Sequence, residues 1–386
     1  MITPSRKSRE IPPFIVMEVL EKAQAMEAAG VDVVHMEVGE PDFDTPACAI
    51  DAAVDGLRAG RTHYTHSMGR RELREAIARW HKQQYGADID PETIIVTNGS
   101  SPALLLTFLA LCDPGDEVIL SNPGYACYPQ IVTFGGGTVV NVDVYEEDGF
   151  QYRPEAIAAK ITPRTKAILV NSPSNPTGNL IDRARLEAIC ALGPTVVSDE
   201  IYHGLVYEGD PVSARQVCAE SIVVNGFSKL FAMTGWRVGY VIVPPELVRP
   251  VQKMQQNFFI SAGDFPQLAA AAALFGCDED TVRMRAEYDR RRRMVLRRCR
   301  EIGLGVTVEP TGAFYVFCNV KAHCAARGLT CYDLAFDILD RAHVAVTPGT
   351  DFGPGGEGYL RLSYANAFER LLEGMDRLSG YFRNRR

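Results

Sequence analysis

The segment Ile222–Gly239 reads IVVNGFSKLFAMTGWRVG and decides how the rest of the chain is interpreted. An apolar run typical of a buried strand leads into a loop that carries Lys229, and Arg237 follows in the same loop. Alone, this pattern is ambiguous, because a lysine after a strand is more often a solvated loop residue than a reactive one.

Two further segments of the same kind favour a reactive lysine. One apolar run leads into NSPSNPTG, which contains Asn175, and another run, Thr195–Ser198, leads into Asp199 and Tyr202. Parallel strands present their carboxyl ends at one edge of a sheet, and ligands bind outside that edge. The three segments therefore predict a ligand crevice lined by polar residues from three strands.

Composition narrows the class of protein. The chain has 386 residues, of which 46% are hydrophobic and 23% charged, and this is ordinary for a soluble globular protein of about two or three domains. A net charge of −8 argues against a nucleic-acid partner and against attraction to anionic membranes. No apolar run reaches the roughly 18 to 20 residues that span a bilayer, and the N-terminus lacks a signal-peptide core. We therefore expect a cytoplasmic protein.

Cysteine and histidine spacing predicts neither a disulfide framework nor a metal site. The ten cysteines are scattered singly with no Cys-x-x-Cys, so most are expected to be small buried hydrophobic residues. His63 and His66 lie in a polar loop without cysteines or carboxylates at ligand spacing.

The alternation of helical and short apolar segments between residues 47 and 285 predicts an α/β fold. Short continuous apolar runs fit strands covered on both faces, so we expect a mostly parallel seven-stranded sheet wrapped by helices. The seven expected strands are Ile94–Thr97, Glu117–Leu120, Thr138–Val142, Ala167–Val170, Thr195–Ser198, Ile222–Val224 and Val238–Val243.

The remaining segments predict an arm and a smaller domain. Residues 1–13 are basic and proline-punctuated, which suggests an arm ordered only against another surface. Residues 14–46 with 286–386 are expected to form an α+β domain, and 47–285 the large cofactor-binding domain. The expected helices of the smaller domain are Phe14–Ala29, Asp280–Ile302, Tyr332–Ala342 and a terminal helix. Its expected strands are Val31–Met36, Gly305–Val308, Ala313–Val320, Val344–Thr347 and Tyr359–Tyr364.

The residue types at the predicted crevice suit one cofactor. A lysine amine forms a Schiff base with an aldehyde, an acid keeps a pyridine nitrogen protonated, and an arginine binds a phosphate. Together these groups fit pyridoxal 5'-phosphate.

The order of motifs resembles the class I and II aminotransferases of the pyridoxal-phosphate fold type I superfamily. NPTG is followed by DEIY from Asp199, then by SK with GWRVG, and the resemblance extends from Val38–Phe43 to Tyr359–Tyr364. It implies that Lys229 holds the cofactor as a Schiff base and that Asp199 pairs with the ring nitrogen. It also implies a homodimer with shared active sites.

The resemblance implies further contacts to the cofactor. The turn Asn98–Pro102, with proline expected at the first position of a helix Ala103–Leu111, also fits a plain capped turn, as found in any α/β protein. The implied phosphate contacts are Gly99, Ser100, Ser101, Ser228 and Arg237, with Tyr64 reaching across the dimer interface. The implied ring contacts are Tyr125, which stacks on the ring, and Asn175 and Tyr202, which bond its phenolic oxygen.

Substrate residues follow from the same resemblance. Arg361 matches the residue that binds the substrate α-carboxylate, and Gly39 and Asn175 are expected beside it. Phe14, Ile15 and Phe314 are candidates for the side-chain pocket, and burial in the core explains them equally well.

The predicted activity is a ping-pong transfer of an α-amino group between an L-amino acid and a 2-oxo acid. The main alternative is a carbon-sulfur β-lyase on the same scaffold, since one fold supports several reactions. A cofactor-binding regulator would need a DNA-binding module, for which the chain has no spare residues. The loop GSSP from Gly99 lacks the lysine that meets a distal carboxylate in the aspartate-specific branch, and Gln256–Ser261 supplies apolar residues. A neutral or aromatic amino donor is therefore favoured.

Overall fold

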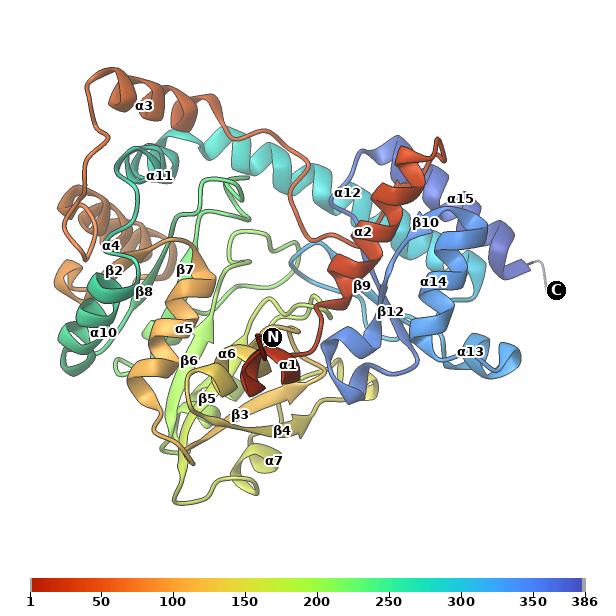
Figure 1. Ribbon diagram of the computed structural model, residues 1–386, viewed down its shortest axis with the longest axis horizontal. Coiled ribbons are helices and arrows are strands. Elements are labelled where there is room, and N and C mark those ends of the chain that lie inside the picture. The colour runs from red at the N-terminus through yellow and green to blue at the C-terminus, as the bar shows by residue number, and fades with distance from the viewer. Residues whose placement is uncertain (1, 384–386) are drawn as a thin grey trace.

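A seven-stranded sheet forms the centre of the computed structural model, which describes residues 2–383 (Figure 1). Its strands are β2 (Ile94–Thr97), β3 (Glu117–Asn122), β4 (Thr138–Asp143), β5 (Thr165–Asn171), β6 (Thr195–Asp199), β7 (Ile222–Gly226) and β8 (Gly239–Ile242). Their order is β2-β8-β7-β6-β5-β3-β4. β8 pairs antiparallel with β2 and β7, and the other neighbours pair parallel. The predicted mostly parallel sheet is confirmed.

Helices cover both faces of this sheet, which explains why its strands are apolar throughout. One apolar cluster joins the sheet to α5 (Ser100–Leu111), α6 (Tyr128–Phe134) and α10 (Pro245–Phe258). The opposite cluster joins it to α3 (Ala47–Arg58), α4 (Arg71–Tyr85), α7 (Pro154–Ala158), α8 (Arg183–Cys190), α9 (Ala214–Val217) and α11 (Asp264–Gly276). Short 3₁₀ turns are η1 (Pro91–Thr93) and η2 (Glu146–Asp148).

A smaller part of the fold, with a third apolar cluster at its core, lies beside the large sheet. Its helices and strands are on the right in Figure 1. It contains an antiparallel sheet of order β11-β12-β9 and a short parallel pair β1-β10. The strands are β1 (Val34–His35), β9 (Tyr315–Asn319), β10 (Val344–Ala345), β11 (Thr347–Pro348) and β12 (Tyr359–Ser363). The helices are α2 (Ile15–Ala28), α12 (Asp278–Ile302), α13 (Lys321–Arg327), α14 (Cys331–Ala342) and α15 (Phe368–Arg383), with 3₁₀ turns η3 (Gly349–Phe352) and η4 (Pro354–Gly356).

Three local expectations need correction. Residues 305–308 form no strand, because Gly305 makes a single isolated bridge with Asn319. The first strand is shorter than expected, since it pairs through Val34 and His35. α5 begins at Ser100, so Pro102 occupies the third helical position instead of the first. A proline is tolerated there because the N–H groups of the first turn have no intrahelical partner.

The expected domain boundary at residues 285 and 286 falls inside the continuous helix α12, and the division into domains stays a prediction.

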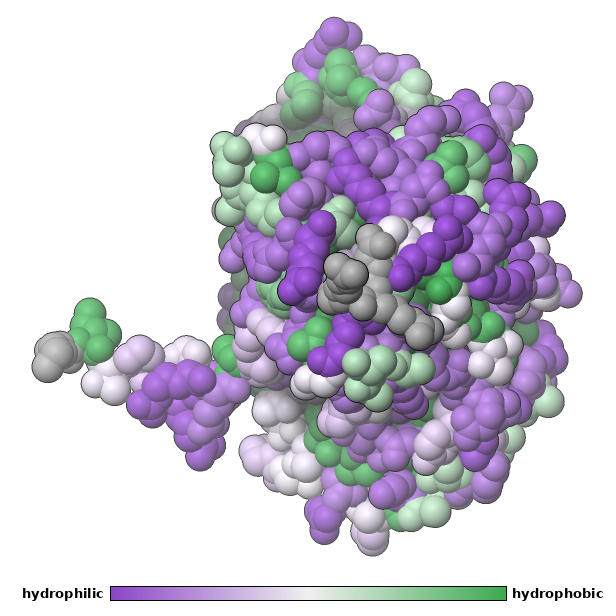
Figure 2. Space-filling view, turned by 90° about the vertical axis from the view of Figure 1, so that its right-hand side faces the viewer, coloured by the Kyte–Doolittle hydropathy of each residue, from purple (hydrophilic) through white to green (hydrophobic). Residues whose placement is uncertain are grey.

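The N-terminal residues stand away from the body of the molecule in Figure 2. The short helix α1 (Arg6–Glu10) has no buried residue, so its own chain gives it little support. Among residues 2–383, no helix combines the length and the apolar character that crossing a membrane requires.

One disulfide corrects the expectation drawn from the cysteine spacing. Cys48, near the start of α3, bonds to Cys277, which directly follows α11, with 6.7 Å between their Cα atoms. The partners are 229 positions apart, so no local spacing could have indicated them. α3 and α11 pack against each other, and the disulfide fastens the ends of these two helices together.

Reducing this disulfide is expected to destabilise the fold. The bond closes a long loop and restricts the unfolded chain, so its loss is expected to lower the free energy of unfolding by about 2 to 5 kcal/mol. Denaturant unfolding with and without dithiothreitol measures the difference. The variant Cys48→Ser serves as control, because its stability is expected not to respond to reductant. Equal stability of the oxidised and reduced wild-type protein would contradict the expectation.

Candidate active site

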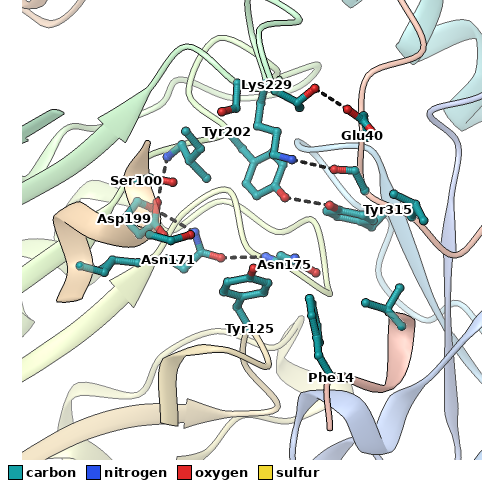
Figure 3. Close-up of a pocket in the computed structure, with 18 of the residues that line it drawn as sticks. Phe14, Glu40, Ser100, Tyr125, Asn171, Asn175, Asp199, Tyr202, Lys229 and Tyr315 are labelled. Carbon is teal, nitrogen blue, oxygen red and sulfur yellow. Dashed lines mark hydrogen bonds between the residues drawn. The ribbon is translucent and has the colours of Figure 1, made fainter. Parts of the chain in front are cut away.

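A cavity of about 430 Å³ opens at the carboxyl edge of the large sheet (Figure 3). Asn171 ends β5, Asp199 ends β6, and Lys229 follows β7, and all three line this cavity. The parallel course of β5, β6 and β7 brings these residues to the same edge. The predicted crevice therefore exists, with side chains from three strands facing one space.

Lys229 is partly buried in the wall of the cavity, where its amine meets a backbone carbonyl from the smaller part of the fold. Nζ donates a hydrogen bond to the carbonyl oxygen of Gly39 over 2.6 Å. Burial lowers the pKa of Lys229 to about 8, because desolvation disfavours the ammonium form, while the nearby Glu40 carboxylate opposes the change. At pH 7 about one tenth of this amine is therefore neutral, far more than of an ordinary lysine, and the neutral form is the one that nucleophilic and basic chemistry requires.

Asp199 lines the same cavity as Lys229 and is buried. Burial raises the pKa of Asp199 to about 6, and the hydrogen bond from Tyr128 works against that rise. Tyr128 donates its hydroxyl to Oδ2 over 2.8 Å, and the backbone N–H of Ile201 donates to Oδ1 over 3.1 Å. Tyr128 was missed from the sequence, although it lies three residues after Tyr125, because nothing local indicates that α6 turns it towards β6.

The start of α5 and a guanidinium form an anion site at one end of the cavity. Gly99 caps α5 with φ 105°, and a Cβ at this position would come within 2.6 Å of Nη2 of Arg237. Glycine therefore lets the exposed Arg237 side chain lie against the helix start. Ser100 and Ser101 line the cavity at the first turn of α5, whose N–H groups have no intrahelical partners. Ser228 lines the cavity as well. This arrangement fits a phosphate group.

Polar handles surround the middle of the cavity. Tyr125, Asn175 and Tyr202 all line it, and Asn175 is held by its backbone N–H bond to Oδ1 of Asn171 over 2.8 Å. The hydroxyl of Tyr202 hydrogen-bonds that of Tyr315 over 2.7 Å. Tyr315 was missed, because its neighbour Phe314 was the candidate named from this segment. Phe314 is fully buried in the apolar cluster beside Tyr202, so its neighbour along β9 is the residue that reaches the cavity.

Arg361 is a buried cation without a matching carboxylate. Its Nη1 donates to Oδ1 of Asn175 over 2.9 Å, and its Nη2 donates to the carbonyl of Glu37 and to the hydroxyl of Thr347. The guanidinium lies over the ring of Tyr315, 4.4 Å from its centroid. Nε has no partner, and within the described residues no carboxylate forms an ion pair with Arg361. A buried positive charge in a cavity wall is stabilised when a carboxylate ligand binds it.

The apolar wall of the cavity comes from the start of α2. Phe14, Val16 and Met17 line the cavity, and the ring of Phe14 packs edge-on against Tyr125 with 6.2 Å between centroids. Ile15 lines a neighbouring cavity instead. Residues 256–261 were expected to supply the apolar contacts. That expectation is wrong for the cavity of the same chain, because this segment, at the end of α10 and just after it, does not line the cavity.

Tyr64 lies outside this cavity. Its side chain is 81% exposed and lines a separate surface depression with Arg61 and His63. The other predicted cofactor and substrate residues line the cavity, except Gly99, which lies beside the Arg237 guanidinium, and the pocket candidates Ile15 and Phe314. Among residues 2–383, no group of three or more histidine, cysteine and acidic side chains could hold a metal ion.

Comparisons with known proteins agree with this geometry. The family model described as "Aminotransferase class I and II" matches residues 31–375. A (5-formylfuran-3-yl)methyl phosphate transaminase of Methanocaldococcus jannaschii is 42% identical, over 98% of this chain and 99% of its own. An aspartate/prephenate aminotransferase of Thermus thermophilus is 40% identical, over 97% of both chains. The solved structure of Thermus thermophilus aspartate aminotransferase with maleate superposes with a TM-score of 0.93 at 39% identity, covering 98% of this chain and 100% of that one.

Removing the Tyr128 hydroxyl is expected to make Asp199 a weaker acid. The pKa of Asp199 is already raised, so its carboxylate form is lost as the pH falls through about 6. Tyr128→Phe removes a hydrogen bond to that carboxylate, and the midpoint is expected to move upward by about one pH unit. Carbon-13 NMR titration of aspartate-labelled protein measures it, with Asp199→Asn assigning the resonance. Tyr240→Phe is a matched control, because it deletes a buried hydroxyl bonded to His81. An unchanged midpoint in Tyr128→Phe would contradict the assignment.

Proposed function

Because this chain belongs to the aminotransferase class I and II family and is a pyridoxal-phosphate-dependent aminotransferase, we propose that Lys229 is its catalytic lysine. We propose a ping-pong transfer of the α-amino group from an L-amino acid to a 2-oxo acid. The observation that carries this proposal is that Lys229 lines one cavity together with the buried Asp199 and the buried Arg361, which has no carboxylate partner among the described residues.

The cavity offers a matching group for each part of the cofactor. Pyridoxal phosphate, when bound, supplies an aldehyde carbon for amines and an electron-withdrawing ring. Asp199 is proposed to hold a proton on the ring nitrogen, since a buried carboxylate pairs well with a pyridinium. Residues proposed to bind the phosphate are Gly99, Ser100, Ser101, Ser228 and Arg237. Those proposed to contact the ring are Tyr125, Asn175 and Tyr202.

Lys229 is proposed to carry the proton that must leave and rejoin the reacting carbon atoms. Its lowered pKa, about 8, lets the amine accept a proton and return it near neutral pH. The carbonyl of Gly39 holds Nζ at the cavity wall through a 2.6 Å hydrogen bond. Tyr202 lies under this amine, with 6.0 Å between Nζ and the ring centroid.

The substrate is proposed to bind through its α-carboxylate to Arg361, beside Gly39 and Asn175. Nη1 and Nη2 of that guanidinium already donate to fixed partners, while Nε has none. The orientation of the guanidinium is therefore set before a ligand arrives. The wall of Phe14, Val16 and Met17 suits a neutral or aromatic side chain, and the absence of a lysine in GSSP argues against strict selection of aspartate. These features support a donor with an uncharged side chain.

Replacing the catalytic lysine tests the proposal directly. Lys229→Ala is expected to lower kcat by at least about 10²- to 10⁴-fold, the usual contribution of a general acid-base group. The assay measures amino transfer from a panel of amino acids to 2-oxoglutarate and to pyruvate, with release of pyruvate from cystathionine followed as a separate reaction. Lys166→Ala, which removes a lysine at the start of β5, is the control and is expected to keep full activity. Normal turnover in Lys229→Ala would exclude the mechanism.

We further propose a cytoplasmic homodimer in which Tyr64 completes the phosphate site of the partner subunit. Tyr64 is 81% exposed and separate from the cavity of its own chain, so a contact with the cofactor of that chain has no support. The exposed arm 2–10 also has little support from its own body, as expected for a segment that packs on a second subunit.

Hybrid dimers test this sharing. One chain carries Tyr64→Ala and the other carries Lys229→Ala, so a shared arrangement leaves one active site with both residues intact. Such a hybrid is expected to recover about half of the wild-type activity per dimer, because one of two equivalent sites is whole. Differently tagged chains allow the hybrid to be purified, and both parent variants are measured beside it. A hybrid no more active than half of the Tyr64→Ala dimer would refute the shared site.

A further inference from the structure

The N-terminus of α2 receives its hydrogen-bonding cap from a residue more than 300 positions away. Oδ1 of Asp351 accepts the backbone N–H of Ile15 over 2.8 Å, and Oδ2 accepts that of Val16 over 3.4 Å. The residue at the cap position itself is Phe14, whose side chain has no acceptor. We propose that Asp351 is a positioning residue, which fixes the start of α2 as the wall that selects the substrate side chain. This inference rests on the proposed function, because it concerns how that substrate is recognised.

The segment that Asp351 caps, at the start of α2, borders two cavities. Residues 12–15 border a second cavity of about 340 Å³, which Tyr125 and η3 also border. Phe14 borders both this space and the larger cavity that contains Lys229. Ile15 also packs against the apolar cluster that α2 shares with α14. That packing fixes the side of the helix, whereas the two hydrogen bonds to Asp351 and the contact of Phe14 with Tyr125 hold its first residues where they border the cavities.

Asp351 is suited to this task by its surroundings. Its side chain is nearly buried, and burial raises the pKa of the carboxyl group, while the two N–H donors and the nearby Arg361 charge lower it. A carboxylate at a helix N-terminus is favoured both by the free N–H groups and by the helix dipole.

The same local structure connects the wall to the proposed α-carboxylate site. β11 pairs with β12 so that Thr347 lies opposite Arg361, and η3 with Asp351 follows β11 directly. The distance from Arg361 to the Phe14 wall is therefore set through η3. A ligand whose carboxylate is bound by Arg361 must fit its side chain within that distance. Asp351 is therefore expected to affect the binding of large side chains and not the binding of the carboxylate itself.

Binding of two carboxylates that differ by a phenyl group tests the proposal without turnover. Propanoate and 3-phenylpropanoate are titrated into the holoenzyme by calorimetry. The wild-type protein is expected to prefer 3-phenylpropanoate. Asp351→Ala is expected to reduce that preference about tenfold, as loss of a helix cap would allow, and to change the propanoate Kd less than about twofold. Hydrogen exchange at Ile15 and Val16 is expected to accelerate by a similar factor.

Two further variants separate positioning from general stability. Asp351→Asn keeps one acceptor oxygen, which caps helices well, and removes the charge, so it is expected to restore the preference and the slow exchange at Ile15, whose N–H makes the shorter of the two hydrogen bonds. Asp182→Ala removes an aspartate cap from α8, where Oδ1 accepts the N–H of Arg185 over 2.8 Å, and it is expected to change neither.

Three results would overturn the role of Asp351: equal weakening of both ligands, unchanged exchange at the start of α2, or an Asp351→Asn protein that behaves like Asp351→Ala. A wild-type protein without preference for the phenyl group would overturn it too. Absence of amino transfer would refute the proposed function and leave these binding and exchange results readable, so the two failures are distinguishable.

Discussion

Desolvation of charged groups at the carboxyl edge of the sheet is the constraint on which the rest of this structure depends. Burial raises the pKa of Asp199 to about 6 and lowers the pKa of Lys229 to about 8, and each change favours the neutral form of its group. Each change corresponds to about 3 kcal/mol in favour of the neutral form. The chain offsets part of this cost with aimed dipoles, namely the Tyr128 hydroxyl on Asp199 and the Gly39 carbonyl on Lys229. A site with such groups is prepared for proton transfer and for a charged ligand.

The two parts of the fold contribute different kinds of group to this cavity. The large sheet supplies Asp199, which ends β6, and Lys229, which follows the neighbouring strand β7. The other part supplies Arg361 from β12, Gly39 from the loop after β1, and the start of α2, which Asp351 caps. In the proposed function, the groups that hold and move protons thus come from the large sheet, and most of the groups that meet the substrate come from the smaller part.

Much of the fold followed from the sequence, because the seven strands of the large sheet are buried on both faces and read as short apolar runs. Expectations failed where pairing was brief. Residues 305–308 have a strand-like composition, yet a single bridge at Gly305 does not make a strand. The start of α5 was misplaced because proline is tolerated throughout a first helical turn. The Cys48–Cys277 bond had no local signal, since it depends on the packing of α3 on α11.

The sequence by itself determined the order of the polar segments, the lysine and acid that follow two strands, and the arginine on the last strand of the small sheet. It could do so because a strand end carries its residue to a known edge of a parallel sheet. Tertiary structure alone decided that Tyr128 donates to Asp199, that Tyr315 and not Phe314 faces the cavity, and that Asp351 caps α2. These contacts join residues far apart in the chain, and which of two adjacent side chains meets a partner is set by the rotation of each element in its packing, which no local pattern records.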